Sequence, residues 1–254
     1  MSKIVCIGDI HGRNIWKDIL DNEKDFDEVV FLGDYFDNRD GIGVDKEISN
    51  FKDILNYKAN NPNIKVTILI GNHDLHYLPN AKDICSGYSK TKHRKLSNIL
   101  ANWRDIFTSC YRSGDYLFSH AGISSVFLAY IGVKSDDNMV DNLNKIFREN
   151  PNIFRFNPIC FNPYGDDIAQ SPLWIRPYSL KKANMGNDYL LNLTQVVGHT
   201  DINVLRESAI WYEYIDELIS GDVSYVYNDG LSSGEYLTIE DGKIYFKSTK
   251  LWQK

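Results

Sequence analysis

Short apolar runs alternate with longer amphipathic segments over the first seventy residues of the chain. Apolar runs over 4–7, 29–32 and 66–70 each stop at a glycine, and such runs predict buried parallel strands. Between them, residues 46–60 place apolar side chains at helical spacing, and Asn14 is in position to cap an earlier helix. This alternation predicts an α/β fold with a largely parallel sheet and crossover helices.

The pattern is less regular farther along the chain. Two helices and two strands are expected in the middle, over 92–107, 136–149, 116–118 and 195–197. Residues 152–186 are rich in Asn, Pro and aromatic residues, and we expect a long, partly irregular surface section there. The last fifty residues predict antiparallel strands with a tight turn at Asp241-Gly242, over 209–215, 224–227, 236–239 and 243–246.

Length and charge narrow the class of protein. The chain has 254 residues and 43% hydrophobic content, without a Pro/Gly/Ser-rich linker, which predicts a single domain over 1–254. Its formal net charge is −6, and no long basic block is present. Proteins that hold nucleic acid through many phosphate contacts are usually basic, so stable nucleic-acid binding is not expected. A nucleotide substrate remains compatible with this charge.

The cysteine spacing and the N-terminal sequence indicate the cellular compartment in which the protein is expected. The 4 cysteines lack C-x-x-C spacing, which argues against a disulfide framework or a thiolate zinc site. The chain enters an apolar strand at once and has no signal-peptide pattern. No apolar stretch approaches the roughly 18 residues of a membrane span. We therefore expect a reduced, cytoplasmic protein without membrane attachment.

Five predicted strand ends carry the residue types that bind metals. A single Gly-Asp pair after a strand is ordinarily just a turn, but five such ends in order indicate a shared site. In open α/β sheets, ligands bind beyond the carboxyl ends of the strands, and glycine permits close backbone approach there. The five segments are Gly8-Asp9-Ile10-His11-Gly12, Gly33-Asp34-Tyr35-Phe36-Asp37, Gly71-Asn72-His73-Asp74, Ser119-His120-Ala121-Gly122 and Gly198-His199-Thr200.

The order of these motifs resembles that of the calcineurin-like metallophosphoesterase superfamily, and within it the phosphoprotein phosphatase branch. The resemblance runs from residue 4 to about 240. Within the family, the chain most resembles the bacterial and phage-type serine/threonine protein phosphatases and the symmetrical dinucleoside polyphosphate hydrolases. The resemblance implies a central β-sandwich of two mixed sheets flanked by helices.

The resemblance also implies a dinuclear metal centre with a defined role for each motif. The chain would then be a hydrolase in which a metal-bridging hydroxide attacks phosphomonoesters directly. Mixed carboxylate, imidazole and amide ligands suit manganese, iron or zinc, and two Mn²⁺ ions are expected, with iron or zinc as alternatives. The implied first-metal ligands are Asp9 and His11, the bridge is Asp34, and the second-metal ligands are Asn72, His120 and His199. His73 would be the general acid, and Asp37 would orient it.

The phosphate-binding arginine is where the chain departs from the family pattern. The family usually has arginine directly after the second Asp of its second motif, and this chain has Asn38 there. Arginine is wanted because its planar fork holds two phosphate oxygens. The candidates are Arg39, one position later, and Arg176 in a Leu-Trp-x-x-Pro-like segment, with Arg13 ranked lower.

Other polar residues near the motifs are open to two interpretations. Asp74 stands where protein phosphatases commonly have Glu, and Asp201 stands where nucleases and phosphodiesterases have a second His. Asp201 is either a further metal ligand or a solvated turn carboxylate. His76 is either a partner of the metal ligands or a structural residue. The basic segment 90–95 is usually a solvated helix face, or else it attracts an anionic substrate.

Several functions are compatible with this motif set. The favoured one is a serine/threonine protein phosphatase, and the alternative is a nucleotide hydrolase such as a symmetrical dinucleoside polyphosphatase. A phosphodiesterase or nuclease ranks third, because the second His is missing and the chain is acidic. A non-catalytic domain on a decayed phosphatase scaffold ranks last, since every ligand position is filled. The expected partner is a phosphorylated protein or nucleotide substrate, and the sequence leaves the oligomeric state open.

Overall fold

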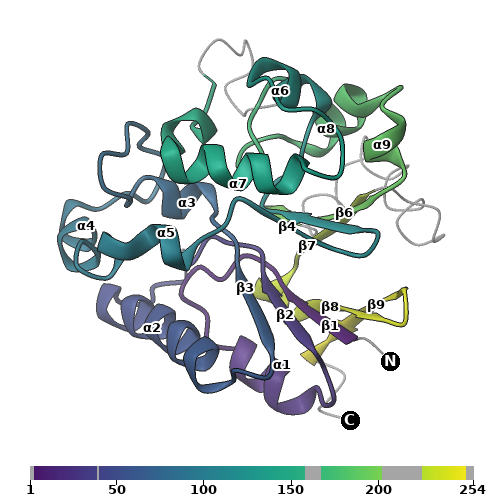
Figure 1. Cartoon of the computed structure of the whole chain (residues 1–254). Coiled ribbons are helices and arrows are strands. Elements are labelled where there is room, and N and C mark those ends of the chain that lie inside the picture. The colour runs from purple at the N-terminus through teal and green to yellow at the C-terminus, as the bar shows by residue number, and fades with distance from the viewer. Residues whose placement is uncertain (1–2, 39, 158–166, 202–224, 250–254) are drawn as a thin grey trace. The chain divides into compact units, whose positions relative to one another are not determined.

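The computed structural model describes residues 3–38, 40–157, 167–201 and 225–249 (Figure 1). The chain forms two compact units. The first unit comprises Met1–Phe107 and Asn228–Lys254, and the second comprises Thr108–Tyr227. The chain therefore leaves the first unit once and returns to it near the C-terminal end.

The first unit is built on a five-stranded sheet in the order β3-β2-β1-β8-β9. Its strands are β1 (Lys3–Ile7), β2 (Glu28–Phe31), β3 (Lys65–Ile68), β8 (Glu235–Glu240) and β9 (Lys243–Ser248). β1, β2 and β3 pair in parallel, which confirms the expected strand–helix–strand arrangement. β8 pairs antiparallel with β1 and β9, so the sheet is mixed. The predicted tight turn joins β8 to β9, with φ of 49° at Asp241 and 77° at Gly242.

The helices of the first unit differ from the sequence prediction at two places. They are α1 (Trp16–Asn22), α2 (Val44–Asn60), α3 (Asn72–Leu75), α4 (Lys90–Leu96), a 3-10 turn (Leu100–Asn102) and α5 (Trp103–Ile106). The helix predicted over 92–107 is thus wrong as one element, because Ser97 and Asn98 favour turn geometry over a continued helix. Asn14 is not the cap of α1, whose N-cap position is Ile15.

Packing of helices against the sheet places α1 and α2 next to each other (Figure 1). The ring of Trp16 in α1 meets the ring of Phe31 in β2 edge-on at 5.7 Å. Its indole N–H donates to the side chain of Asn50 in α2 at 2.9 Å. Burial of these aromatic faces stabilises the unit.

The second unit has a four-stranded sheet in the order β4-β5-β6-β7. Its strands are β4 (Cys110–Ser113), β5 (Tyr116–Ser119), β6 (Thr194–Asp201) and β7 (Tyr225–Asp229), and the last two residues of β7 belong to the first unit. β4 pairs antiparallel with β5, and β5 pairs parallel with β6. The helices are α6 (Ser125–Tyr130), α7 (Met139–Glu149), a 3-10 turn (Pro151–Phe154), α8 (Pro177–Asn184) and α9 (Asp188–Leu191).

One expectation for this unit is corrected, one agrees with the structure, and one lies outside the described residues. The section 152–186 is partly irregular in its described residues, as expected, and α8 forms within it with a proline at its first position. Strand β6 does not end at Gly198 but continues through His199 to Asp201. The strand predicted over 209–215 falls in 202–224, outside the described part of the chain.

The two sheets confirm the expected α/β class with mixed sheets flanked by helices. The single-domain assignment stays a prediction.

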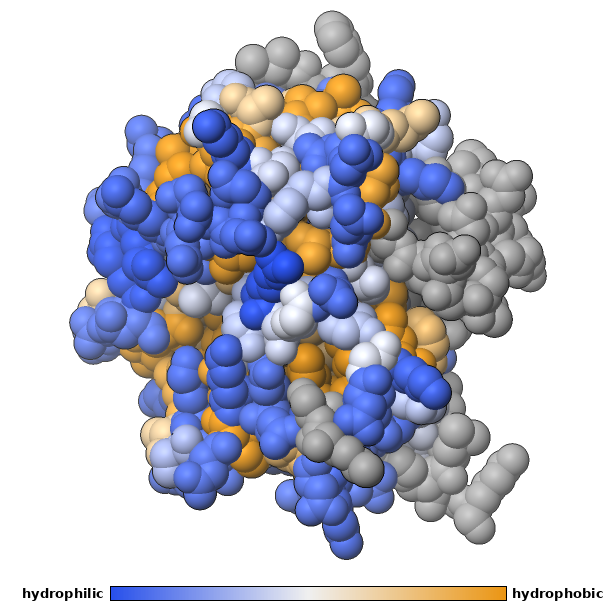
Figure 2. Space-filling model, turned by 45° about the vertical axis from the view of Figure 1, so that its right-hand side comes forward, coloured by the Kyte–Doolittle hydropathy of each residue, from blue (hydrophilic) through white to orange (hydrophobic). Residues whose placement is uncertain are grey.

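Three cysteines in the described residues, Cys6, Cys85 and Cys110, are free thiols. Every described helix is too short or too polar to cross a membrane. Hydrophilic side chains cover most of the face shown in Figure 2, with hydrophobic areas between them.

Candidate metal centre and active site

The loops that follow β1 and β2 are held together by backbone hydrogen bonds. His11 N donates to Asp34 O at 2.6 Å, and Gly12 N donates to Tyr35 O at 3.0 Å. These bonds bring the side chains of Asp9, His11 and Asp34 together, with one ligand atom of each within 4.8 Å of the others. Asp9 and Asp34 are buried at 1% and 2% exposure. The first unit therefore groups three of the predicted metal ligands.

His11 is oriented as a metal-binding histidine should be. Its Nδ1 lies 2.7 Å from Phe36 O, and since a carbonyl only accepts, Nδ1 carries the hydrogen. Nε2 then has a free lone pair and lies 3.6 Å from Asp34 Oδ2. Burial lowers the pKa of His11 more than the Asp34 carboxylate raises it, so the ring is held neutral. A neutral imidazole beside two carboxylates is a donor set that fits a divalent cation.

Asp74 fixes the backbone that carries Asp34. Its Oδ2 accepts from Asp34 N at 2.9 Å and from Gly71 N at 2.8 Å, and its Oδ1 accepts from Tyr35 N at 2.8 Å. The residue is fully buried. From the sequence, Asp74 is only a departure from the phosphatase pattern, and this role went unpredicted. The signal was an acidic residue three positions after Gly71, a placement typical of helix starts.

Gly71 allows the third motif to approach Asp34 closely. A Cβ added to Gly71 would lie 2.1 Å from Asp34 Oδ1 and 2.4 Å from Asp34 N. His73 N, two residues on, donates to the same Oδ1 at 2.9 Å. The third motif thus packs directly against the predicted bridging carboxylate, and any side chain at position 71 would force Asp34 to move.

Left-handed backbone conformations concentrate at the predicted site. Among the described residues, seven that are not glycine have positive φ. Four of them are His11 at 42°, Asp34 at 52°, Asp37 at 63° and His199 at 64°. Such conformations cost free energy for residues with a Cβ and persist where the surrounding structure enforces them. Their coincidence with predicted site residues is independent support for a functional site.

His73 and Asp37 form the pair expected of a general acid and its orienting carboxylate. His73 Nδ1 lies 3.1 Å from Asp37 Oδ2. Burial alone would lower the pKa of His73, but the nearby Asp34 and Asp37 carboxylates raise it to about 11. The His73 ring meets the His11 ring edge-on at 5.2 Å, which places the pair next to the grouped metal ligands. The neighbouring carboxylates thus favour the protonated form of His73, from which a proton can be donated.

Cys85 is a neighbour of this pair that the sequence did not reveal. Its Sγ lies 3.1 Å from His76 Nδ1 and 3.8 Å from His73 Nδ1. Burial would raise the pKa of the Cys85 thiol, but the two histidines lower it. Asn72, the remaining predicted ligand of the first unit, is 3% exposed, and its Nδ2 lies 3.9 Å from the same sulfur.

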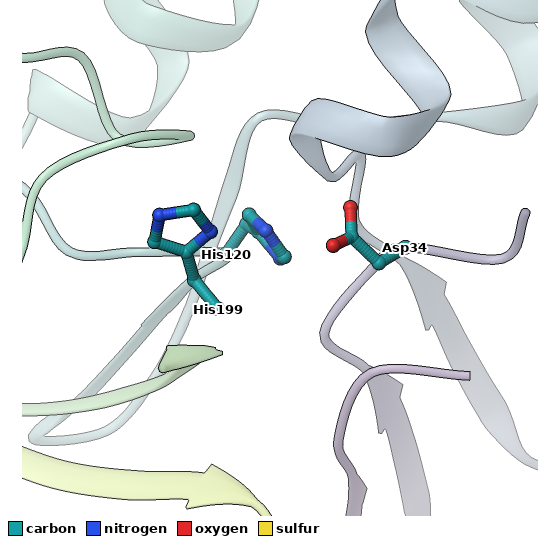
Figure 3. A group of neighbouring side chains, drawn as sticks. All are labelled: Asp34, His120 and His199. Carbon is teal, nitrogen blue, oxygen red and sulfur yellow. The ribbon is translucent and has the colours of Figure 1, made fainter. Parts of the chain in front are cut away.

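The second unit brings its two predicted histidine ligands together. The ring centroids of His120 and His199 are 5.0 Å apart at an interplanar angle of 63° (Figure 3). Gly198 N donates to His120 O at 2.7 Å, which joins the end of β5 to β6. His120 is fully buried, whereas His199 is partly exposed. Trp174 packs edge-on against His199 at 5.9 Å.

The structure places two of the three candidate arginines. In the second unit, Arg176 Nη1 donates to His199 O at 3.1 Å and to Thr200 Oγ1 at 3.2 Å. In the first unit, Arg13 Nε lies 2.7 Å from Asp40 Oδ2. Arg39 lies outside the described residues.

Asn38, at the usual arginine position of the family, closes its own loop. Its side chain exchanges hydrogen bonds with the backbone of Ile42, at 2.7 Å to the carbonyl oxygen and 2.8 Å from the amide nitrogen. Asp201 is the last described residue of β6, and the choice between metal ligand and turn carboxylate stays open.

Comparison with known proteins gives one family match. The family model for calcineurin-like phosphoesterases matches residues 2–156. No curated protein sequence matches the chain.

Solved structures with this fold are distant in sequence. A cold-active protein-tyrosine phosphatase from a Shewanella species has a TM-score of 0.61 at 17% identity, over 98% of this chain and 78% of that one. A protein serine/threonine phosphatase from Saccharomyces cerevisiae has a TM-score of 0.54 at 14% identity, over 97% and 79%. A metallophosphoesterase from Sphaerobacter thermophilus has a TM-score of 0.52 at 14% identity, over 97% and 88%. At these identities the likeness is one of fold.

Proposed function

Because the chain belongs to the calcineurin-like phosphoesterases, and is thus a metal-dependent phosphoesterase, we propose that it is a serine/threonine protein phosphatase with a dinuclear metal centre. The observation that carries the proposal is the group of Asp9, His11 and Asp34. The neutral His11 ring keeps Nε2 free beside the carboxylates, as a ligand to a divalent cation must.

The proposed metal ligands come from all five motifs. Asp9 and His11 would hold the first ion, and Asp34 would be a ligand shared by both ions. For the second ion, the ligands proposed from the sequence motifs are Asn72, His120 and His199. Mn²⁺ is the proposed metal, with iron or zinc as alternatives that suit the same ligands. When bound, two such ions activate water near neutral pH and neutralise charge on the phosphoryl group.

His73 is proposed to deliver the proton that the leaving oxygen needs. Its Nδ1 is tied to Asp37 Oδ2 at 3.1 Å, so the proton on Nε2 is the one available to substrate. Asp37 fixes the orientation of the ring and stabilises its charge. Protonating the leaving oxygen matters most for alkyl phosphates, whose leaving groups are strongly basic.

Arginine side chains are proposed to hold the phosphate group. Arg176 Nη1 donates to His199 O and to Thr200 Oγ1, which fixes the orientation of a guanidinium whose planar fork suits phosphate oxygens. Arg39 is the second proposed clamp, on the strength of its position next to the second motif.

The preference for a phosphoprotein substrate rests on the family branch and on two structures of the same fold. One of these proteins is a protein-tyrosine phosphatase, and another is a protein serine/threonine phosphatase. Hydrolysis of dinucleoside polyphosphates is the competing function. The net charge of −6 supports action without stable nucleic-acid binding, and a cytoplasmic location is part of the proposal.

Substrate class is tested by Mn²⁺-dependent phosphate release from two kinds of substrate side by side. One is a set of phosphoserine, phosphothreonine and phosphotyrosine peptides, and the other is diadenosine tetraphosphate. Asp34→Asn is the blank, because loss of the bridging charge is expected to remove nearly all turnover. Faster release from phosphoserine and phosphothreonine peptides supports the proposal. Preference for the dinucleotide reassigns the chain to nucleotide hydrolysis, and preference for phosphotyrosine contradicts the serine/threonine assignment.

A further inference from the structure

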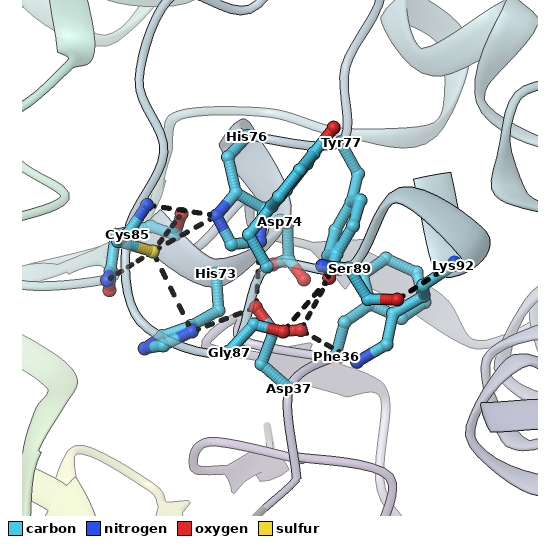
Figure 4. A network of polar contacts seen from close by, with 12 residues as sticks. Phe36, Asp37, His73, Asp74, His76, Tyr77, Cys85, Gly87, Ser89 and Lys92 are labelled. Atoms are coloured by element: carbon cyan, nitrogen blue, oxygen red, sulfur yellow. Dashed lines mark hydrogen bonds and ion pairs between the residues drawn. The ribbon is translucent and has the colours of Figure 1, made fainter. Parts of the chain in front are cut away.

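Among the described residues, four polar groups contact the carboxylate of Asp37, two at each oxygen (Figure 4). Oδ2 lies 3.1 Å from His73 Nδ1 and 2.7 Å from His76 Nε2. Oδ1 accepts hydrogen bonds from the Tyr77 hydroxyl at 2.6 Å and the Lys92 ammonium at 2.7 Å. Burial opposes ionisation of Asp37, but these four contacts outweigh it and hold the pKa of Asp37 well below its usual range. These four side chains therefore set the orientation of the Asp37 carboxylate.

Lys92 reaches Asp37 from α4, within the basic segment 90–95. The side chain of Lys92 is only 6% exposed, whereas that of Lys95 is 44% exposed. Lys92 Nζ also lies 2.7 Å from Oε2 of Glu47, a residue of α2 that is fully buried. The expectation that this segment is a solvated helix face is therefore wrong for Lys92. Burying an ammonium is costly, and the two carboxylates around it offset that cost.

Resting on the proposed role of His73 as general acid, we propose that Lys92 is a positioning residue that keeps Asp37 Oδ2 aligned with His73 Nδ1. The terminal torsion of an aspartate is soft, and turning it would change which oxygen faces His73. A hydrogen bond from a charged donor is roughly twice as strong as one between neutral groups. Lys92 supplies such a bond at Oδ1, where Tyr77 supplies a neutral one. The ammonium thus resists rotation of the carboxylate from the side opposite His73.

A purely structural role is the competing explanation, because the same lysine joins α4 to α2 through Glu47. The two explanations predict different kinetics. Loss of stability reduces the amount of folded enzyme and lowers turnover of every substrate in proportion. Loss of Asp37 alignment slows only those reactions in which His73 must protonate the leaving oxygen.

The experiment compares Lys92→Met with wild type and His73→Asn, all loaded with Mn²⁺. Two substrates are used: phosphoserine, an alkyl phosphate, and p-nitrophenyl phosphate, whose leaving group needs little protonation. For Lys92→Met, kcat on phosphoserine is expected to fall about 10- to 100-fold, the range for a misplaced catalytic group. On p-nitrophenyl phosphate the fall is expected to stay below about threefold. The double variant His73→Asn/Lys92→Met is expected to be no slower than His73→Asn, because both changes remove one function.

Two further variants control for stability. Lys95→Met removes an exposed ion pair with Asp45, which also joins α4 to α2, and is expected to leave the ratio of the two rates unchanged. Lys92→Met leaves the Glu47 charge buried without its partner and is at risk of misfolding. Glu47→Gln/Lys92→Met avoids that charge and is expected to show the same split between substrates.

The outcomes separate this inference from the proposed function. If His73→Asn slows both substrates equally, the general-acid role is wrong and the role of Lys92 falls with it. If His73→Asn shows the split but the Lys92 variants slow both substrates equally or neither, only the positioning role is overturned. A double variant slower than His73→Asn on phosphoserine overturns it as well.

Discussion

Replacing Gly71 by alanine tests whether close packing of the third motif against Asp34 builds the metal centre. The added Cβ would lie 2.1 Å from Asp34 Oδ1, and real Cβ contacts essentially never fall below 3.0 Å. Asp34 must therefore move by about 0.9 Å, the difference between these distances. The added Cβ would also lie 2.4 Å from Asp34 N, which is held by a hydrogen bond to Asp74, so rotation of the Asp34 side chain alone cannot relieve the clash.

The expected result is a protein that folds but binds Mn²⁺ weakly. Overpacking of this kind typically costs about 1–3 kcal/mol of stability. Displacing a metal ligand through its surroundings typically weakens metal binding about 10- to 100-fold. Urea unfolding of the metal-free protein measures the first effect, and isothermal titration with Mn²⁺ measures the second.

Gly43→Ala is the matched control, because a Cβ at Gly43 meets nothing within 4 Å and its φ is −64°. As the N-cap of α2 it is expected to lose less than about 1 kcal/mol. Its Mn²⁺ affinity should equal that of wild type. A Gly71→Ala protein that binds Mn²⁺ as tightly as wild type would refute the idea that this contact positions Asp34.

Three further outcomes are expected. Asp74→Asn replaces one of the two oxygens that accept from three buried N–H groups by an amide that donates. The variant should therefore be less stable by roughly 2–4 kcal/mol in urea unfolding, and wild-type stability would contradict the organising role of Asp74. Chelation with EDTA should abolish turnover and Mn²⁺ should restore it, with circular dichroism showing a retained fold, whereas turnover that survives chelation would argue against the metal centre. Burial opposes ionisation of Glu23, but hydrogen bonds from Lys3, Tyr236 and Lys247 lower its pKa, so its stabilisation is present above the ordinary glutamate pKa and lost as pH falls. Glu23→Gln should therefore be less stable than wild type by roughly 2 kcal/mol at pH 7, and this difference should shrink below a pH of about 4.3. Urea unfolding at pH 7 and at a pH below about 4.3 measures it, and an equal difference under the two conditions would count against this reasoning.

The metal-ligand group of the first unit could be predicted from the sequence, because its position depends on the local pattern of apolar runs and glycines. Apolar runs that stop at glycine fixed β1, β2 and β3, and the carboxyl ends of parallel strands meet at one edge of a sheet. Asp9, His11 and Asp34 follow directly from that rule. His199 was found as a candidate, but the continuation of β6 through it was not, since a residue with φ of 64° inside a strand leaves no sequence signal.

The supporting residues could not be predicted, because tertiary packing decides their roles. Lys92 and Lys95 belong to one basic segment, yet one is buried against Asp37 and the other is exposed. Cys85 lies between two histidines only because the loop before α4 folds back over α3. No periodicity or composition distinguishes such residues from their neighbours in the chain.

The sheet order of the first unit also has a consequence for biosynthesis. β1 lies between β2 and β8, and its register pairs Lys3 with Glu240. On the ribosome, β1 to β3 emerge early, while β8 follows only after the whole second unit. At about 5–20 residues per second, that delay is roughly 8–35 s. Throughout it, the apolar run 4–7 presents an open strand edge, which other nascent chains can join. The yield of native protein therefore depends on how well that edge is protected until the last strands are made.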